Sequence, residues 1–197
     1  MKKTNQDNSN KDDGSQNKKE FIITHLFDAP REFVFKAWTD PKHIMQWWGP
    51  KGFTAPHIRI DLRPNGHYHY CMRSSDGKEY WSGGIFKEID APKRIVCTDY
   101  FADEKGKMID PVDYGMSPDF PKESEVIITF EEHDNKTRLT IHYSPKTAAE
   151  YDAMMKSQMD IGWKQSLDRL AEVVGKGLER TIRLDDFDMF QEGVKER

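Results

Sequence analysis

Three side chains that can bind transition metals alternate in the segment GHYHYCMR: His67, His69 and Cys71. Imidazole and thiolate groups are ligands for zinc and copper. Alternate residues of a strand share one face, but they lie about 7 Å apart, roughly twice the rise per residue. The pattern also supplies no fourth ligand. We therefore interpret these residues as the polar outer face of a sheet, and we expect neither a metal nor a cofactor.

Residues suited to acid–base chemistry occur in two segments that alternate like strands. Asp99 and Tyr143 could place polar groups near the mouth of a cavity, where a carboxyl group can exchange protons with a ligand. Asp99 could equally face water or pair with Arg94. The sequence contains no GxSxG turn and no cysteine beside a poised base. It therefore assigns no catalytic residue and favours a non-catalytic protein, while an enzyme remains an alternative.

Large aromatic and methionine side chains are more numerous than a small sheet needs for a solid core. A cavity lined by them would suit a flat or aliphatic ligand, because methionine adapts to irregular shapes. The alternative is that these side chains simply fill the core. The residues expected to line the cavity are Trp47, Trp48, Phe53, Tyr68, Tyr70, Met72, Phe86, Met155, Met159 and Trp163.

A long interruption from residue 102 to residue 123 contains three prolines and separates two strand-like segments. Loops of this length commonly act as lids or binding loops. Tyr114, Met116 and Phe120 would either close over the cavity or hold the loop on the surface. Both interpretations stay open at this point.

The elements that position these residues follow from the hydrophobic period. A strand over 20–27 is followed by two short helices, because Phe33, Val34, Ala37 and Trp38 have helical spacing and TDP starts a second pattern. From Phe53 onward the period becomes two, and turn signals punctuate it. The predicted strands are about 54–62, 67–73, 79–89, 94–101, 124–132 and 137–143.

One long amphipathic helix is predicted over residues 147–174, since apolar residues recur there at steps of three or four. Thr147 and Glu150 resemble a capping box, and Gly175 is a plausible C-terminal stop. In this arrangement Met155, Met159 and Trp163 face the sheet. Residues 176–197 form an extension of ambiguous structure.

Composition limits the partners and the compartment. The 197 residues fit one domain, and 30 basic against 34 acidic residues provide no basic stripe for nucleic acid. Residues 1–18 are polar and predict a disordered tail before a domain over 19–175. The sequence has no secretory leader and no membrane-spanning run, so we expect a cytoplasmic monomer or homodimer. Cys71 and Cys97 are expected to be free thiols, two strand spacings apart.

Five strings in order resemble the START-related (SRPBCC) superfamily. They are FDAPREFVFKAWTDPKHIMQWWGPKGF, DLRPNGHYHYCMRSSDGKEY, GGIFKEIDAPKRIV, YGMSPDFPKESEVIITFEE and GWKQSLDRLAEVV. Within the superfamily they are similar to the branch named after the C-terminal domain of the activator of heat-shock protein ninety ATPase. The resemblance covers residues from about 20 to 175. It implies an α+β helix-grip (START-like) fold, in which a curved antiparallel sheet wraps around a long C-terminal helix.

Three functions are compatible with this fold, because a fold does not specify a chemistry. The leading hypothesis is a non-catalytic protein that holds a small hydrophobic or aromatic molecule between the sheet and the long helix. The second is a co-factor of the chaperone ATPase, or another module that binds a protein partner through its outer surface. The third is an enzyme of cyclase or hydrolase type that uses the same cavity.

Overall fold

The computed structural model describes the backbone of residues 19–192 and the side chains of residues 19–179. In this range the chain forms seven strands, four α-helices and one 3-10 turn. The strands are β1 (Phe21–Phe27), β2 (Thr54–Ile60), β3 (His67–Arg73), β4 (Glu79–Asp90), β5 (Arg94–Ala102), β6 (Ser124–His133) and β7 (Lys136–Tyr143). The helices are α1 (Arg31–Thr39), α2 (Pro41–Trp47), η1 (Pro111–Tyr114), α3 (Ala148–Lys156) and α4 (Met159–Glu192).

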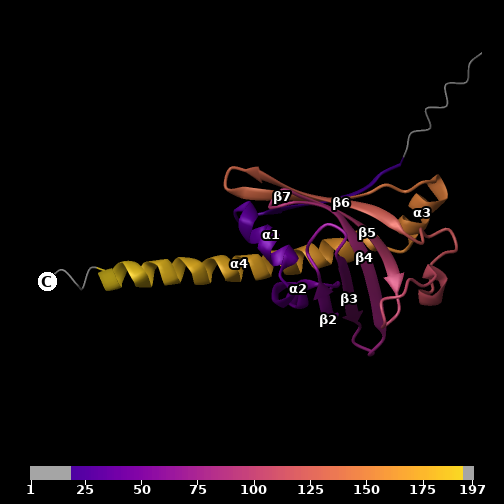
Figure 1. Cartoon of the computed structure of the whole chain (residues 1–197), viewed down its shortest axis with the longest axis horizontal. Coiled ribbons are helices and arrows are strands. Elements are labelled where there is room, and N and C mark those ends of the chain that lie inside the picture. Colours follow the sequence, from indigo (N-terminus) through magenta and orange to yellow (C-terminus); the bar gives the residue numbers. More distant parts are fainter. Residues whose placement is uncertain (1–18, 193–197) are drawn as a thin grey trace, which may run out of the picture.

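The strands form one antiparallel sheet in the order β1-β7-β6-β5-β4-β3-β2. Strands β2 to β7 follow one another as a meander, and β1 joins the far edge by pairing with β7. The sheet curls around α4, and α1 and α2 pack against the same helix (Figure 1). The predicted helix-grip α+β fold is therefore confirmed, and each predicted strand agrees with the observed one to within two residues.

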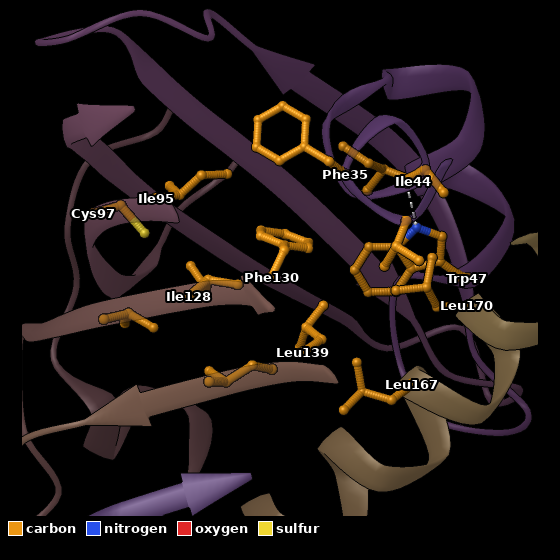
Figure 2. Close-up of a cluster of buried hydrophobic side chains, with 14 of the residues drawn as sticks. Phe35, Ile44, Trp47, Ile95, Cys97, Ile128, Phe130, Leu139, Leu167 and Leu170 are labelled. Carbon is orange, nitrogen blue, oxygen red and sulfur yellow. Dashed lines mark hydrogen bonds between the residues drawn. The ribbon is translucent and has the colours of Figure 1, made fainter. Parts of the chain in front are cut away.

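A solid core joins β6 and β7 to α1, α2 and the middle of α4 (Figure 2). Leu167 and Leu170 of α4 are fully buried, and Figure 2 shows Leu167 beside Leu139 of β7 and Leu170 beside Trp47 of α2. Trp47 of α2 is also fully buried, and its indole Nε1 donates a hydrogen bond to the Ala37 carbonyl oxygen at 2.9 Å. This bond satisfies the single polar group of a large apolar side chain, which allows the indole to lie in the core.

The predicted single helix over 147–174 is wrong in two respects. The chain breaks between α3 and α4, where Gln158 has a φ of 59°. This left-handed conformation interrupts the helical hydrogen bonds, although the apolar period continues across it. Helix α4 also continues past Gly175 to Glu192. Glycine is tolerated inside a helix at a penalty of about 1 kcal/mol relative to alanine, so Gly175 alone does not end one.

The start of α3 does match the predicted capping box. Thr147 Oγ1 accepts a hydrogen bond from the Glu150 backbone N–H at 3.1 Å. The Glu150 carboxylate accepts in return from the backbone N–H of Lys146 at 2.6 Å, one residue before the expected partner. These bonds satisfy backbone donors that the helix itself cannot pair.

Gly84 of β4 allows a tyrosine ring to lie close to the sheet. A Cβ atom at this position would be 1.9 Å from the Thr98 carbonyl oxygen and 2.4 Å from the Tyr68 ring. The strand register shifts further along, between Phe86 and Glu88. The glycine therefore provides space for Tyr68, and the bulge in β4 follows it.

Strand β4 lies between β3 and β5, as the meander predicted, so it separates Cys71 from Cys97. Both cysteines are free and buried. The predicted disordered tail over residues 1–18 lies outside the described residues, as do the side chains of the extension beyond residue 179.

Candidate functional site

A hollow of about 440 Å³ lies between the inner face of the sheet and the junction of α3 and α4. The sheet contributes Met72, Tyr80 and Phe101, and the helices contribute Met154 and Met159. Residues from the segments 48–53 and 116–121 complete the wall. Most of the lining is apolar or aromatic, which is typical of pockets that hold small organic molecules.

Three tryptophans form a layer between this hollow and the solid core. Trp38 stacks on Trp163 with ring centroids 5.9 Å apart and an interplanar angle of 12°, and Trp48 meets Trp163 edge-on at 5.5 Å. A second space of about 40 Å³ lies deeper in the fold. Trp48, Trp163, Asp99 and Tyr143 line both spaces and so mark the boundary between them.

Two tyrosines hold the carboxyl group of Asp99 at this boundary. The Tyr68 hydroxyl lies 2.9 Å from Asp99 Oδ1, and the Tyr143 hydroxyl lies 3.1 Å from Asp99 Oδ2. The Tyr68 hydroxyl is also 2.9 Å from the Thr98 carbonyl oxygen, so its proton has a choice of two acceptors. Strands β3, β5 and β7 thus bring three polar groups together. Of the alternatives considered for Asp99, pairing with Arg94 does not occur, since Arg94 forms an ion pair with Glu88.

Burial dominates the acid–base properties of this cluster. It raises the pKa of Asp99 to about 6, and the hydrogen bonds from Tyr68 and Tyr143 oppose this only in part. Burial, followed by the neighbouring carboxylate of Asp99, raises the pKa of both tyrosines well above the ordinary value. Asp99 keeps some exposed surface because the hollow reaches it, although the surrounding protein still raises the pKa of its carboxyl group. It can therefore change charge near neutral pH, while the tyrosines stay neutral.

Arg169 holds the segment that carries two aromatic side chains of the hollow. Its guanidinium Nη1 donates to the carbonyl oxygens of Gly49, Pro50 and Phe53 at 2.7, 3.2 and 3.1 Å. Nη2 donates to the Gln46 carbonyl oxygen, near the end of α2, at 3.0 Å. A cation at a helix C-terminus is favourable, and the planar fork reaches several acceptors at once. Arg169 therefore fixes the loop between α2 and β2 to α4.

The structure brings many of the predicted cavity residues to the hollow and places others elsewhere. Those that line the hollow are Trp48, Phe53, Met72, Met159 and Trp163, together with Asp99, Tyr143, Met116 and Phe120. Those that line only the deeper, smaller space are Tyr68, Tyr70 and Phe86.

Three of the predicted site residues need correction. Trp47 lies in the solid core, because its indole bonds to the Ala37 carbonyl oxygen behind the tryptophan layer. Met155 is 39% exposed, since the break at Gln158 turns α3 so that Met154 faces inward. Tyr114 does not line the hollow.

Tyr114 instead attaches the long loop to the sheet. Its hydroxyl donates to the Ala102 carbonyl oxygen at 3.0 Å and accepts from the Trp81 backbone N–H at 3.1 Å. The hydroxyl thus bridges β4 and β5. Of the two interpretations of the loop, attachment to the surface fits Tyr114, whereas Met116 and Phe120 line the hollow.

Several lining residues were not predicted. Tyr80 shares a face with Met72, its partner on β3, and Phe101 shares a face with Asp99. The two-residue period of the strands was sufficient to find both. Met154 left no comparable signal, because its inward position depends on the break between α3 and α4. Arg169, which holds the wall without lining the hollow, left none either, because its acceptors are carbonyl groups 116 to 123 positions away.

The outer face of β3 carries the histidines that were considered as metal ligands. The His69 ring stacks on Trp81 with centroids 4.8 Å apart, and its Nε2 lies 3.0 Å from the Asp103 carbonyl oxygen. His57 packs edge-on against His69. Among the described residues no group of three His, Cys, Asp or Glu side chains could hold a metal ion. These rings form an aromatic cluster on the outside of the sheet.

A family model for activator of Hsp90 ATPase homolog 1-like proteins matches residues 28–175. The match covers most of the chain. The chain belongs to the activator of Hsp90 ATPase homolog 1-like family. The hollow, the cluster of Asp99 with Tyr68 and Tyr143, and the break between α3 and α4 all lie within residues 28–175. Family membership supports a ligand-binding or co-chaperone-like module.

Solved structures similar to this chain come from several bacteria. A solution structure from Arthrobacter aurescens is 25% identical, with a TM-score of 0.70, and the match covers 81% of this chain and 88% of that one. A crystal structure from Mycobacterium smegmatis is 26% identical, with a TM-score of 0.62 and coverage of 80% and 89%.

The AHSA1 protein from Silicibacter pomeroyi is 20% identical, with a TM-score of 0.61 and coverage of 81% and 99%. At this identity the likeness shows the fold alone. No curated protein sequence matches the chain. Among residues 19–192, no helix has both the length and the apolar character needed to cross a bilayer.

Proposed function

We propose that this protein binds a small hydrophobic or aromatic molecule in the hollow between the sheet and the α3–α4 junction. The observation that carries the proposal is the hollow itself, about 440 Å³ in volume, with aromatic and methionine side chains on several sides. Pockets of this size and composition accommodate small organic ligands. Arg169 and Tyr114 support the proposal, because each holds a wall segment in place through backbone groups.

Binding of a neutral fluorescent probe, N-phenyl-1-naphthylamine, tests this proposal. We expect saturable binding to the wild-type protein with a blue shift of the emission. Gly162 provides the decisive variant, because it lines the hollow and a Cβ atom there would meet nothing within 4 Å. Gly162→Leu should fill part of the hollow and weaken binding at least about tenfold, while helix propensity keeps the fold stable.

Gly175→Leu is the matched control. Gly175 lies on the same helix, is exposed, and would also accept a Cβ atom without a contact within 4 Å, but it does not line the hollow. This variant should bind the probe as the wild type does. Equal binding by both variants, or no saturable binding to the wild type, would contradict the proposal.

Acid–base catalysis in the same hollow is a second candidate, and the convergence of Asp99 with Tyr68 and Tyr143 favours it. A carboxylate with a pKa of about 6 can accept a proton from a carbon next to a carbonyl group and return it. Incubation of 2-acetonaphthone with the protein in D2O would show deuterium entering the methyl group by NMR. Asp99→Asn should abolish the exchange. Exchange at the rate of the buffer alone would remove this candidate.

A surface for a protein partner has less support. Ile22 and Leu26 of β1 are 53% and 52% exposed on the outer face of the sheet. Thr24 lies between them, and their cross-strand neighbours on β7 are His142 and Arg138. The exposed apolar atoms are therefore interrupted by polar side chains, unlike the continuous patches typical of protein interfaces.

A further inference from the structure

The hollow contains one carboxyl group and almost no compensating charge. Among the described residues that line it, the charged side chains are Asp99 and Lys51. Lys51 is exposed and belongs to the loop after α2, whereas Asp99 lies where the hollow meets the deeper space. No basic side chain in the described range forms an ion pair with Asp99, and none lowers its pKa. A buried carboxylate without a cation is unfavourable unless something else compensates it.

The two tyrosines compensate Asp99 only partly. Each carboxylate oxygen has one tyrosine hydroxyl within 3.1 Å. A carboxylate can accept about four hydrogen bonds, so acceptor capacity remains on both oxygens. Tyr68 can also turn its proton to the Thr98 carbonyl oxygen, which would leave Oδ1 with fewer donors. A molecule in the hollow that brings a donor would therefore meet an unsatisfied acceptor.

The groups around Asp99 suit a cation in particular. Trp48, Trp163 and Tyr143 line the same two spaces as Asp99. Aromatic rings attract cations through their π-electrons, and a carboxylate adds direct charge attraction. An anionic ligand would instead face repulsion from Asp99 in a site of low dielectric.

We propose that the hollow selects a molecule with an apolar or aromatic body and a protonated amine, and that the amine donates its hydrogen bonds to the Asp99 carboxylate. The apolar body would contact the sheet residues Met72, Tyr80 and Phe101 and the helix residue Met159. This inference rests on the function proposed above and specifies the ligand class. Binding is non-covalent: the protonated amine of the ligand leaves water and forms an ion pair with the Asp99 carboxylate.

Three competitors of nearly equal shape test the inference. Each compound is titrated against bound N-phenyl-1-naphthylamine, and its displacement of the probe is measured. At neutral pH 2-(2-naphthyl)ethylamine carries a positive charge, 2-ethylnaphthalene is uncharged, and 2-naphthylacetate carries a negative charge. On the wild type we expect the amine to displace the probe at a concentration about tenfold or more below that of 2-ethylnaphthalene. The carboxylate should be the weakest of the three. In Asp99→Asn the advantage of the amine should fall below about threefold.

The outcomes separate this inference from the proposed function. Equal displacement by the amine and by 2-ethylnaphthalene on the wild type would overturn the selectivity and leave the hydrophobic site intact. Stronger displacement by 2-naphthylacetate, or an unchanged advantage of the amine in Asp99→Asn, would also overturn it. Failure of the probe to bind saturably would overturn the proposed function and this inference together.

A pH series on the wild type covers the case in which Asp99→Asn does not fold. The groups facing Asp99 are Tyr68 and Tyr70 from β3, Cys97 from β5 and Tyr143 from β7, and burial keeps all four neutral by raising their pKa values. The advantage of the amine should therefore shrink as the pH falls from about 8 to about 5, because Asp99 gains a proton. The same advantage at both pH values would contradict the inference.

Discussion

The two ends of the interface between α4 and the sheet differ in how completely they are packed. In the middle of α4, Leu167 and Leu170 are fully buried. Figure 2 shows Leu167 beside Leu139 of the sheet. At the start of α4, Gly162 and Ser166 line the hollow. Both parts belong to one helix facing one sheet, and Trp163 lies between them as part of the tryptophan layer.

The difference shows that side-chain volume decides where a pocket forms along a continuous interface. Leucines at the solid end reach the facing side chains of β6 and β7. Glycine and serine at the other end leave space between the helix and the sheet, and the break at Gln158 turns Met154 toward that space. Atoms that face a hollow have fewer van der Waals partners to lose.

Truncation at the two ends should separate them most clearly. Leu167→Ala should lower the free energy of unfolding by about 2–5 kcal/mol, because it leaves a void in a close-packed core. Met159→Ala should lower it by less than about 2 kcal/mol, because Met159 lines the hollow and is only half-buried. Urea unfolding followed by circular dichroism measures both. Equal losses would mean that the hollow end is packed as tightly as the core.

The pH dependence of stability should depend on Asp99 at the boundary between the two ends. Its pKa is raised to about 6 in the folded protein, so the folded state binds the proton more tightly than the unfolded state. The contribution of protonated Asp99 to the free energy of unfolding is therefore fully present below the pKa of Asp99 in the unfolded state. It is lost as the pH rises through the pKa of Asp99 in the folded state. Between about pH 4 and about pH 7 the wild type should lose on the order of 2 kcal/mol relative to Asp99→Asn. A constant difference over this range would contradict the raised pKa.

Removal of Arg169 should loosen the hollow without disturbing the core. Arg169→Ala should lower the free energy of unfolding by roughly 1.5 kcal/mol, because four backbone carbonyl groups lose a charged donor. It should also weaken the binding of N-phenyl-1-naphthylamine, since Trp48 and Phe53 are carried by the released segment. Lys164→Ala, at an exposed position of the same helix, is the control. Equal probe binding by the two variants would mean that Arg169 is not required to hold the loop between α2 and β2 in its binding position.

The smallest expected effect concerns the loop that closes the other side of the hollow. Tyr114→Phe should lower the free energy of unfolding by about 1 kcal/mol, because the Trp81 N–H and the Ala102 carbonyl oxygen lose their shared hydroxyl. Probe affinity should change less than about twofold, since Tyr114 does not line the hollow. Phe120→Ala should weaken binding more. The reverse order, measured by fluorescence titration, would assign Tyr114 to the binding surface.

Local patterns in the sequence were sufficient for most of the fold. The two-residue period and the turn residues predicted six of the strands, and the five family-like strings predicted how they assemble. The same period placed Tyr68, Tyr70 and Met72 on the inner face. These features depend on neighbours in the sequence, or on alternation that a strand imposes on its own side chains.

The site depended on contacts that the sequence does not record. The apolar steps from Met155 to Met159 and Trp163 predicted one stripe, but a single left-handed residue, Gln158, turned Met155 outward. Likewise Trp47 and Trp48 are adjacent and identical, and only packing decides that one fills the core while the other lines the hollow.

The sequence by itself determined the class of fold, the inward faces of the strands and the presence of a large aromatic interior. The tertiary structure alone decided that this interior divides into a solid end and a hollow end, and that Asp99 meets Tyr68 and Tyr143 at the boundary. The physical reason is distance along the chain. Asp99 is 31 positions from Tyr68 and 44 from Tyr143, so its hydrogen bonds, its burial and its pKa arise only when the sheet closes around α4.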